Sequence, residues 1–289
     1  MTSLLHRTEA ILLWFIYHGL RLLPLDTASA LGGRIARTIG PLLPPSKRAK
    51  RNLELALPGA DHDAIIKDMW ENLGRLAGEY PHSATFLHDP SRIELVGDHY
   101  VRELLARNQP VIFFSGHIGN WELTYPLMAR LGVKGSGVYR APDNPYLNWL
   151  FDRRTTYPDL DMIPKGAVGA RRSIEALAKG RCLALFVDQK MNDGIEVPLF
   201  GRPAMTAPAL ATLALRYGAP VVPFRLIRLN GARFRAEFLQ PIVFTPTGNR
   251  NADQLRVMSE VNAILEGWIR VTPAQWLWLH RRWPKEFYR

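Results

Sequence analysis

A histidine and a glutamate in the string HIGNWE are the residues of this chain best placed to do chemistry. Residues 111–114 form an apolar run rich in β-branched and aromatic side chains, which predicts a buried strand. His117 follows that strand, and open α/β sheets bind their ligands at the carboxyl ends of strands. Gly116 and Gly119 permit a tight turn, so we expect His117 on the turn and Glu122 in the first turn of the next helix. An imidazole held by a carboxylate at one nitrogen can accept a proton at the other.

This histidine comes without a nucleophile of its own. The sequence has no serine in a G-x-S-x-G string, and its one cysteine, Cys182, lies inside an apolar run. We therefore expect His117 to act as a general base on a hydroxyl that a substrate brings.

Two further predicted strands end in polar residues. Residues 137–139 form a short strand followed by Arg140 and Asn144, and an apolar strand that begins at residue 182 ends in Asp188 and Gln189. Because the carboxyl ends of parallel strands share one edge of a sheet, we expect these side chains to converge with His117 and to bind substrate.

The roles of these residues stay open at this level. The planar guanidinium of Arg140 suits a substrate phosphate, although a surface arginine after an edge strand fits the pattern equally well. Asp188 either orients Arg140 or a substrate hydroxyl, or caps the turn that follows it. Asn144 braces its loop or contacts the substrate. Arg202, in the turn GRP, is a weaker candidate for phosphate binding.

The charge of the chain favours an anionic partner. Its 289 residues carry a formal net charge of +11, which suits nucleic acid, anionic lipid headgroups, a phosphorylated substrate or an acidic carrier protein. A single cysteine excludes an internal disulfide and fits a reducing compartment. The sequence contains no zinc-finger or RNA-recognition signature, no H-E-x-x-H string and no phosphate-binding glycine motif, so we expect no nucleic-acid partner, no metal and no cofactor.

The first helix is a candidate for membrane contact. Its unbroken apolar core, residues 10–17, is too short to span a bilayer. It is either a helix lying at the membrane interface or an ordinary buried helix, and a basic cluster that follows it favours the interface. That cluster comprises Arg34, Arg37, Lys47, Arg48, Lys50 and Arg51.

The pattern of predicted elements changes near residue 90. Residues 1–90 form a helical, membrane-associating region, and residues 91–289 alternate between strands and helices; together they make one structural unit. Asn230-Gly231 predicts a β-hairpin between two longer strands. We therefore predict an α/β fold with a mixed, largely parallel sheet flanked by helices and an N-terminal helical region. The main predicted helices are 31–43, 46–57, 61–80, 100–107, 167–179, 207–217 and 251–270, with one more from residue 121.

HIGNWE is similar to the H-x4-[D/E] signature of glycerolipid acyltransferases, and its H-x-GNWE form resembles the lipid A late acyltransferases. The resemblance extends from about Arg51 to Trp283. RAKRNLELALPG resembles the R-x-N-x5-P segment of that family, and YRAPDNP resembles its Y-R-x-x-x-N block. The segment after Asp188 matches with Leu199 in place of an aromatic residue, and PAQWLWLHRRW matches with Ala274 in place of a glutamate.

The resemblance implies a specific activity and place. A fatty acyl group would pass from acyl carrier protein to the hydroxyl of a 3-hydroxyacyl chain on a lipid A precursor, a phosphorylated glycolipid. The enzyme would lie on the cytoplasmic face of the bacterial inner membrane, with His117 and Glu122 as catalytic pair and an anionic membrane surface beside it.

Two alternatives remain open. The same chemistry could act on a lysophospholipid, a mannosylated inositol lipid or an amino-acid lipid. A basic nucleic-acid-binding protein would explain the charge, but it gives no reason for H-x-GNWE.

Overall fold

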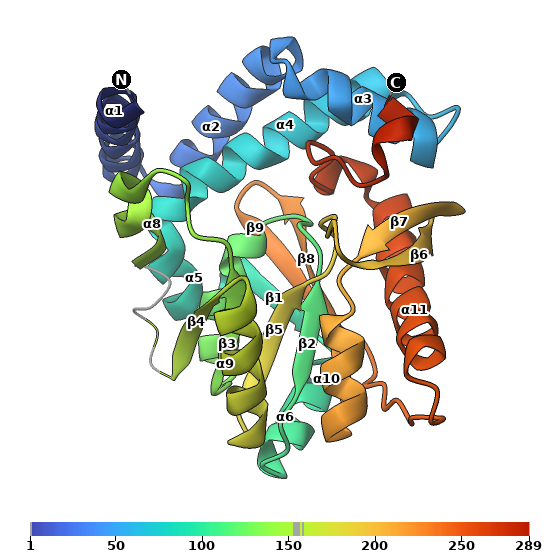
Figure 1. Ribbon diagram of the computed structural model, residues 1–289. Helices are drawn as coiled ribbons and strands as arrows, with labels where there is room; N and C mark the ends of the chain where they lie inside the picture. The colour runs from blue at the N-terminus through green and yellow to red at the C-terminus, as the bar shows by residue number, and fades with distance from the viewer. Residues whose placement is uncertain (1, 153–156, 158, 289) are drawn as a thin grey trace.

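A seven-stranded sheet forms the centre of the protein (Figure 1). The computed structural model describes residues 2–152, 157 and 159–288. The strand order is β1-β9-β8-β2-β5-β3-β4, and every neighbouring pair is parallel except β8 with β9. The predicted fold class, a mixed and largely parallel sheet flanked by helices, is confirmed. The strands are β1 (Ile93–Val96), β2 (Ile112–Ser115), β3 (Gly135–Tyr139), β4 (Leu160–Pro164), β5 (Cys182–Phe186), β8 (Val221–Asn230) and β9 (Arg233–Phe238).

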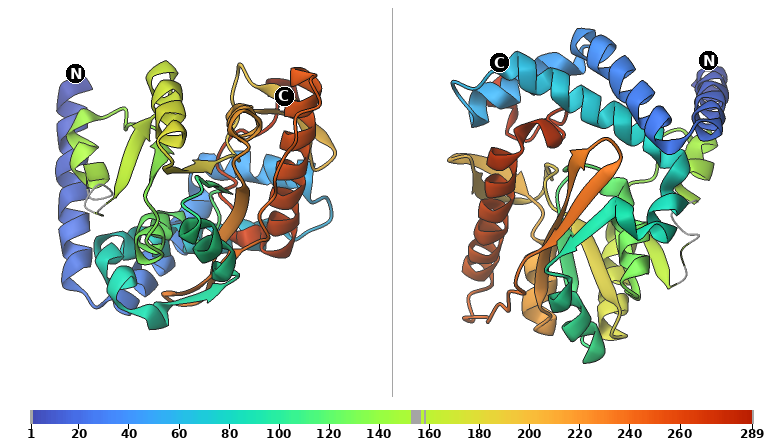
Figure 2. Two further views of the ribbon diagram at one scale, coloured as in Figure 1. Left: turned by 90° about the horizontal axis from the view of Figure 1, so that it is seen from below. Right: turned by 180° about the vertical axis from the view of Figure 1, so that it is seen from behind.

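Both faces of the sheet are buried, which explains why β2 is apolar from Ile112 to Phe114. Ile112 and Phe114 belong to one core cluster, whereas Val111 and Phe113 belong to a second one. Helices cover the two faces, as the views of Figures 1 and 2 show. They are α6 (Asp98–Ala106), α7 (Thr124–Arg130), α9 (Ala167–Ala178), α10 (Ala209–Tyr217) and α11 (Arg250–Val271). A separate hairpin, β6 (Ile195–Leu199) with β7 (Arg202–Thr206), packs on α11.

The N-terminal region is helical and lies across one end of the sheet (Figure 1). Its helices are α1 (Thr2–Leu22), α2 (Leu25–Ile39), α3 (Pro45–Ala56), α4 (His62–Glu79) and α5 (Ser83–His88). Asp61 begins α4 as predicted, since its carboxylate accepts the N–H of Ala64 at 3.0 Å. α2 packs tightly on α4 because Gly32 faces Gly74: a Cβ on Gly32 would lie 2.3 Å from the Gly74 carbonyl oxygen.

α1 stands at the side of this layer, next to the short α8 (Asn148–Asp152) (Figure 1). The ring of Tyr17 contacts that of Trp149, with centroids 5.1 Å apart. In the described part of the chain, no helix combines the length and the apolarity that crossing a bilayer requires.

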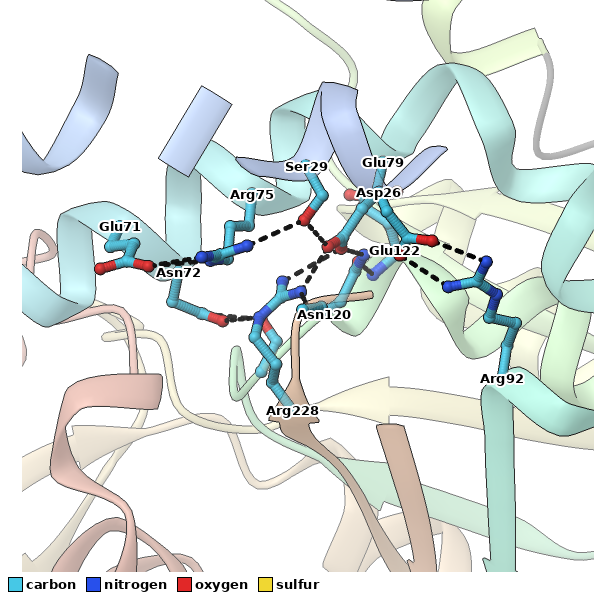
Figure 3. A network of polar contacts seen from close by, with 12 residues as sticks. Asp26, Ser29, Glu71, Asn72, Arg75, Glu79, Arg92, Asn120, Glu122 and Arg228 are labelled. Carbon is cyan, nitrogen blue, oxygen red and sulfur yellow. Dashed lines mark hydrogen bonds and ion pairs between the residues drawn. The ribbon is translucent and has the colours of Figure 1, made fainter. Parts of the chain in front are cut away.

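A buried ion pair joins the helical layer to the sheet (Figure 3). The carboxylate of Glu79, at the end of α4, is fully buried and binds the guanidinium of Arg228 from β8. Ser29 of α2 and Asn120 each donate a hydrogen bond of 2.7 Å to the same carboxylate. Arg228 also donates to the Asn72 side chain at 2.9 Å. The charge of Glu79 is therefore paired and hydrogen-bonded on several sides, as burial requires.

Breaking this pair should cost the fold heavily. Arg228→Met leaves the Glu79 carboxylate buried without its countercharge, so we expect the free energy of unfolding to fall by about 3–5 kcal/mol. Arg235→Met is the matched control, because Arg235 lies on the adjacent β9 and pairs with Glu94 at the surface. It should change stability by at most about 1 kcal/mol. Urea unfolding measures both, and equal losses would contradict the assigned role of Glu79–Arg228.

Candidate active site

The register of β2 with β5 brings His117 and Asp188 together. Ser115 pairs with Phe186 in the parallel ladder, and each of the two site residues lies two positions beyond its strand partner. The His117 Nδ1 atom is 2.8 Å from Asp188 Oδ1, and the His117 backbone N–H donates to Oδ2 at 2.7 Å. Asp188 is buried, whereas 15% of the His117 side chain is exposed. The imidazole is thus anchored from inside and reachable from outside.

Asp188 is held as a carboxylate. Trp276 Nε1 donates a third hydrogen bond to it, at 2.9 Å from Oδ2. Burial by itself would raise the pKa of the Asp188 carboxyl, but the charge of His117 and the hydrogen bonds from His117 and Trp276 hold this pKa well below its ordinary value. Since a carboxylate only accepts hydrogen bonds, Nδ1 of His117 carries a proton and Nε2 of the neutral ring has a free lone pair.

The carboxylate at Nδ1 is that of Asp188, not that of Glu122 as we predicted from the spacing. Glu122 lies in a single 3-10 turn, η4 (Trp121–Leu123), and its N–H donates to the Asn120 side chain at 3.2 Å. The prediction was wrong because the parallel pairing of β2 with β5 places Asp188, 71 positions away in the sequence, next to His117. Asp188 had been expected to orient Arg140 or a substrate hydroxyl, or to cap a turn; it binds His117 and Trp276 instead.

The loop that carries His117 is closed by a segment near the end of the chain. Leu277 donates its N–H to the His117 carbonyl at 3.0 Å, and Gly119 donates to the Gln275 carbonyl at 2.9 Å. The Asn72 side chain of α4 donates to the Gly119 carbonyl at 2.9 Å. The backbone on either side of the imidazole is therefore fixed by hydrogen bonds from α4 and from residues 275–277.

Gly119 is the residue for which this loop requires glycine. Its φ is +60°, and a Cβ there would lie 1.8 Å from the Leu226 carbonyl oxygen. The strand β8 thus approaches the loop too closely for any side chain.

Arg140 and Asn144 follow β3 at the same edge of the sheet, but neither is hydrogen-bonded to the histidine pair among the described residues. Arg140 is exposed and pairs with Asp143 at 3.0 Å. Asn144 is buried, and its Nδ2 donates to the His6 carbonyl at 2.8 Å and to Glu9 at 2.9 Å. Asn144 therefore fastens its loop to α1, the bracing role of the two that the sequence left open.

Arg202, the third candidate for phosphate binding or substrate contact, lies on β7. Its Nε donates to the Leu55 carbonyl at 3.1 Å, and its guanidinium lies 5.7 Å from the centroid of the Phe287 ring. These contacts connect β7 with α3 and with the C-terminal residues.

Gln189, in contrast, does lie at the site, together with two residues that we did not select from the sequence. The His280 ring lies 6.2 Å from the His117 ring, measured between centroids. Gln189 Nε2 is 3.5 Å from His280 Nε2, and its Oε1 accepts from Lys165 Nζ at 3.2 Å. The only sequence signal for His280 was its place in the string LHRRW, and Lys165 had none, because β4 was not predicted.

Metal-binding side chains do not gather at this site. Within residues 2–152, 157 and 159–288, no three His, Cys, Asp or Glu side chains lie together as metal ligands would.

Comparison with known proteins assigns the chain to one enzyme family. The chain matches the family described as "Bacterial lipid A biosynthesis acyltransferase" over residues 1–285, and it belongs to that family. It is 28% identical over 251 residues to the lipid A biosynthesis lauroyltransferase of Escherichia coli K12, covering 82% of this chain and 79% of that protein. It is 27% identical over 246 residues to a lipid A biosynthesis acyltransferase of Haemophilus influenzae, covering 81% and 76% of the two chains.

The low pKa of Asp188 predicts how the stability of the protein responds to acid. Above about pH 5 the carboxyl is ionised in the folded and the unfolded chain, and its full stabilising contribution is present. As the pH falls below that value, the unfolded chain takes up the proton first, so this contribution is progressively lost. The wild type should therefore lose its advantage in unfolding free energy over Asp188→Asn progressively as the pH falls from about 5 to about 3. This range brackets the ordinary pKa of an aspartate carboxyl.

Urea unfolding at a series of pH values measures this difference. Asp143→Asn, which replaces an exposed aspartate at the same edge of the sheet, is the control, and we expect it to change the free energy of unfolding by at most about 1 kcal/mol. A wild-type advantage over Asp188→Asn that stays constant down to pH 3 would contradict the assignment.

Proposed function

We propose that this lipid A biosynthesis acyltransferase moves a fatty acyl group from the thioester of acyl carrier protein to a hydroxyl of a phosphorylated lipid A precursor. One observation carries the proposal: in a chain of this family, a partly exposed imidazole is held at Nδ1 by a buried carboxylate. That arrangement supplies a general base at Nε2 and provides no enzyme nucleophile, which matches transfer to a hydroxyl that the substrate brings.

The reaction follows from this geometry. His117 Nε2 removes the proton of the acceptor hydroxyl while its oxygen attacks the thioester carbonyl carbon. The new C–O bond forms, the C–S bond breaks as the tetrahedral intermediate collapses, and the thiolate leaves with the proton from His117. Asp188 holds the ring in one tautomer and stabilises the imidazolium that forms in between. Glu122, the carboxylate of the H-x4-E string, remains in the proposal as the alternative acid for this orienting role.

Removing the base should abolish most of the activity without unfolding the protein. His117→Ala should lower the rate of acyl transfer at least 10²–10⁴-fold, the usual value of a positioned general base. His99→Ala is the matched control, because His99 is an exposed histidine on α6. Transfer of radiolabelled lauroyl groups from acyl carrier protein measures both, with a lipid A precursor and a lysophospholipid as separate acceptors.

The same assay tests the partner of the histidine. Asp188→Asn removes the charge that holds the tautomer and should lower turnover by up to about 10⁴-fold, the effect of the same substitution in a Ser-His-Asp triad. Near-normal turnover in His117→Ala would end the proposed mechanism. Near-normal turnover in Asp188→Asn would assign the orienting role to another acid, with Glu122 the first to test.

We propose further that the protein acts on the cytoplasmic face of the inner membrane and docks there through α1 and α2. The support is a set of exposed large apolar side chains on these two helices, next to a group of arginines. Such a surface suits an interfacial helix on an anionic leaflet. The apolar side chains are Leu4, Leu5, Ile11, Leu12, Trp14, Phe15, Ile16, Leu22, Leu31, Ile35 and Ile39, and the arginines are Arg7, Arg21, Arg34 and Arg37.

A charge placed on this surface should weaken membrane binding. Phe15 is 64% exposed, and Phe15→Glu should lower partitioning onto vesicles of phosphatidylglycerol and phosphatidylethanolamine tenfold or more, about the value of one buried phenylalanine. Val271→Glu is the control, because Val271 is similarly exposed at the end of α11. Co-sedimentation measures both, and equal effects would contradict docking through α1.

A further inference from the structure

Beside the catalytic imidazole, three donor side chains from three separate segments meet. Lys165 follows β4, Gln189 follows β5, and His280 comes from the segment after α11. The Gln189 amide lies between the other two, with Oε1 3.2 Å from Lys165 Nζ and Nε2 3.5 Å from His280 Nε2. The His280 ring is 6.2 Å from the His117 ring. This cluster is open to solvent, since Lys165 and His280 are both exposed.

Positive side chains outnumber acidic ones around this cluster. The charged groups that act on His280 include Arg48, Lys165 and the acid Asp188, and His117 adds positive charge when it is protonated. The oxygens of Asp188 already accept the hydrogen bonds of His117 and of Trp276. A negative group arriving from solvent would therefore meet the positive charges of Arg48 and Lys165.

We propose that Lys165, Gln189 and His280 form a subsite for a phosphate group of a substrate, directly next to the base. The inference rests on the proposed function and deepens it. The Lys165 ammonium, the Gln189 amide N–H and, once His280 is protonated, its imidazolium N–H approach from three different segments, and a tetrahedral phosphate offers several acceptor oxygens to match them. Phosphate binding to this cluster places the reacting hydroxyl of the same molecule within reach of His117.

The arginines that the sequence suggested for this task are engaged elsewhere. Arg140 pairs with Asp143, and Arg202 donates to the Leu55 carbonyl. Lys165, in contrast, directs its ammonium group toward the site, across the end of β3 to the Gln189 side chain.

Distance also decides between the two sources of phosphate. The donor carries its phosphate at the far end of the long pantetheine arm, away from the thioester. The acceptor carries a phosphate on the sugar backbone to which its hydroxyacyl chains are attached. A phosphate next to His117 therefore belongs to the acceptor.

Phosphate binding to this subsite should change the protonation of His280. Partial loss of hydration at this otherwise exposed ring, together with positive charge on His117, Arg48 and Lys165, lowers the pKa of His280 below its ordinary value, against the opposing effect of Asp188. Phosphate next to His280 favours the imidazolium, so binding should raise this pKa and take up a proton.

Inorganic phosphate is the first probe, because its binding to the subsite can be measured without any acyl transfer. We expect a titration of the full-length protein, followed by ¹⁵N NMR of labelled histidines, to raise the apparent pKa of the His280 resonance in the wild type. Lys165→Gln should weaken the apparent phosphate affinity about tenfold, the usual effect of losing one charge-assisted hydrogen bond. Lys179→Gln, an exposed lysine after α9 at the opposite edge of the sheet, should leave it unchanged.

Steady-state kinetics then identifies the source of the phosphate. For Lys165→Gln we expect KM to rise about tenfold for the phosphorylated acceptor and to stay unchanged for the same acceptor after phosphatase treatment, with kcat preserved. The rise should persist when the donor is a lauroyl N-acetylcysteamine thioester, which has no phosphate. A rise that disappears with this donor would support the subsite but assign it to the donor phosphate.

Two results would overturn the subsite. One is a His280 resonance that does not respond to phosphate in a wild type that transfers acyl groups normally. The other is an equal change in KM for both acceptors and both donors. A wild type that binds phosphate at His280 but transfers no acyl group would instead contradict the proposed function, so the two failures are distinguishable.

Discussion

The buried carboxylate of Asp188 needs hydrogen-bond donors to replace the water that it loses, and the site is built around this need. Its two oxygens accept from the backbone N–H of His117, from the imidazole and from Trp276. The same three bonds that solvate the charge also fix the tautomer of the ring, the conformation of its loop and the seating of residues 275–277. The same contacts therefore both orient the imidazole and stabilise the buried charge of Asp188.

The N-terminal helices also hold the loop that follows His117, from its other side. Asn72 and Glu79 lie on α4 and hold Gly119 and Asn120, so the N-terminal region contributes to positioning the imidazole although it supplies no atom to the reaction. The buried charge of Glu79 is in turn balanced by Arg228 of the sheet. The loop is thus fixed between an ion pair and an ion–dipole cluster, and it has little freedom to move.

Local patterns in the sequence were sufficient for the fold class, the central strand and His117. The apolar runs at residues 111–114 and 182–186 predicted β2 and β5, and Asn230-Gly231 predicted the hairpin of β8 and β9. Local patterns do not reveal how distant strands pair in the sheet. Asp188 was therefore selected as a site residue but with the wrong partner, and the role of holding His117 was assigned to Glu122 instead. β4 and the β6–β7 hairpin were missed, because Ile163 and Pro164, and Pro198 and Pro203, interrupt the alternation that identifies strands. Lys165 was missed together with β4, and His280 was not selected although the string that contains it was.

The pairing of residues 117–119 with residues 275–277 has a consequence for the timing of maturation. Synthesis runs from the N-terminus, so β2 and its histidine leave the ribosome long before Gln275 and Trp276 do. Until the last of these residues emerges, Asp188 lacks its indole donor and the loop lacks its backbone partners. In a nascent chain the imidazole is therefore not yet held in one tautomer, and the candidate active site is complete only after the segment that contains Trp276 has folded.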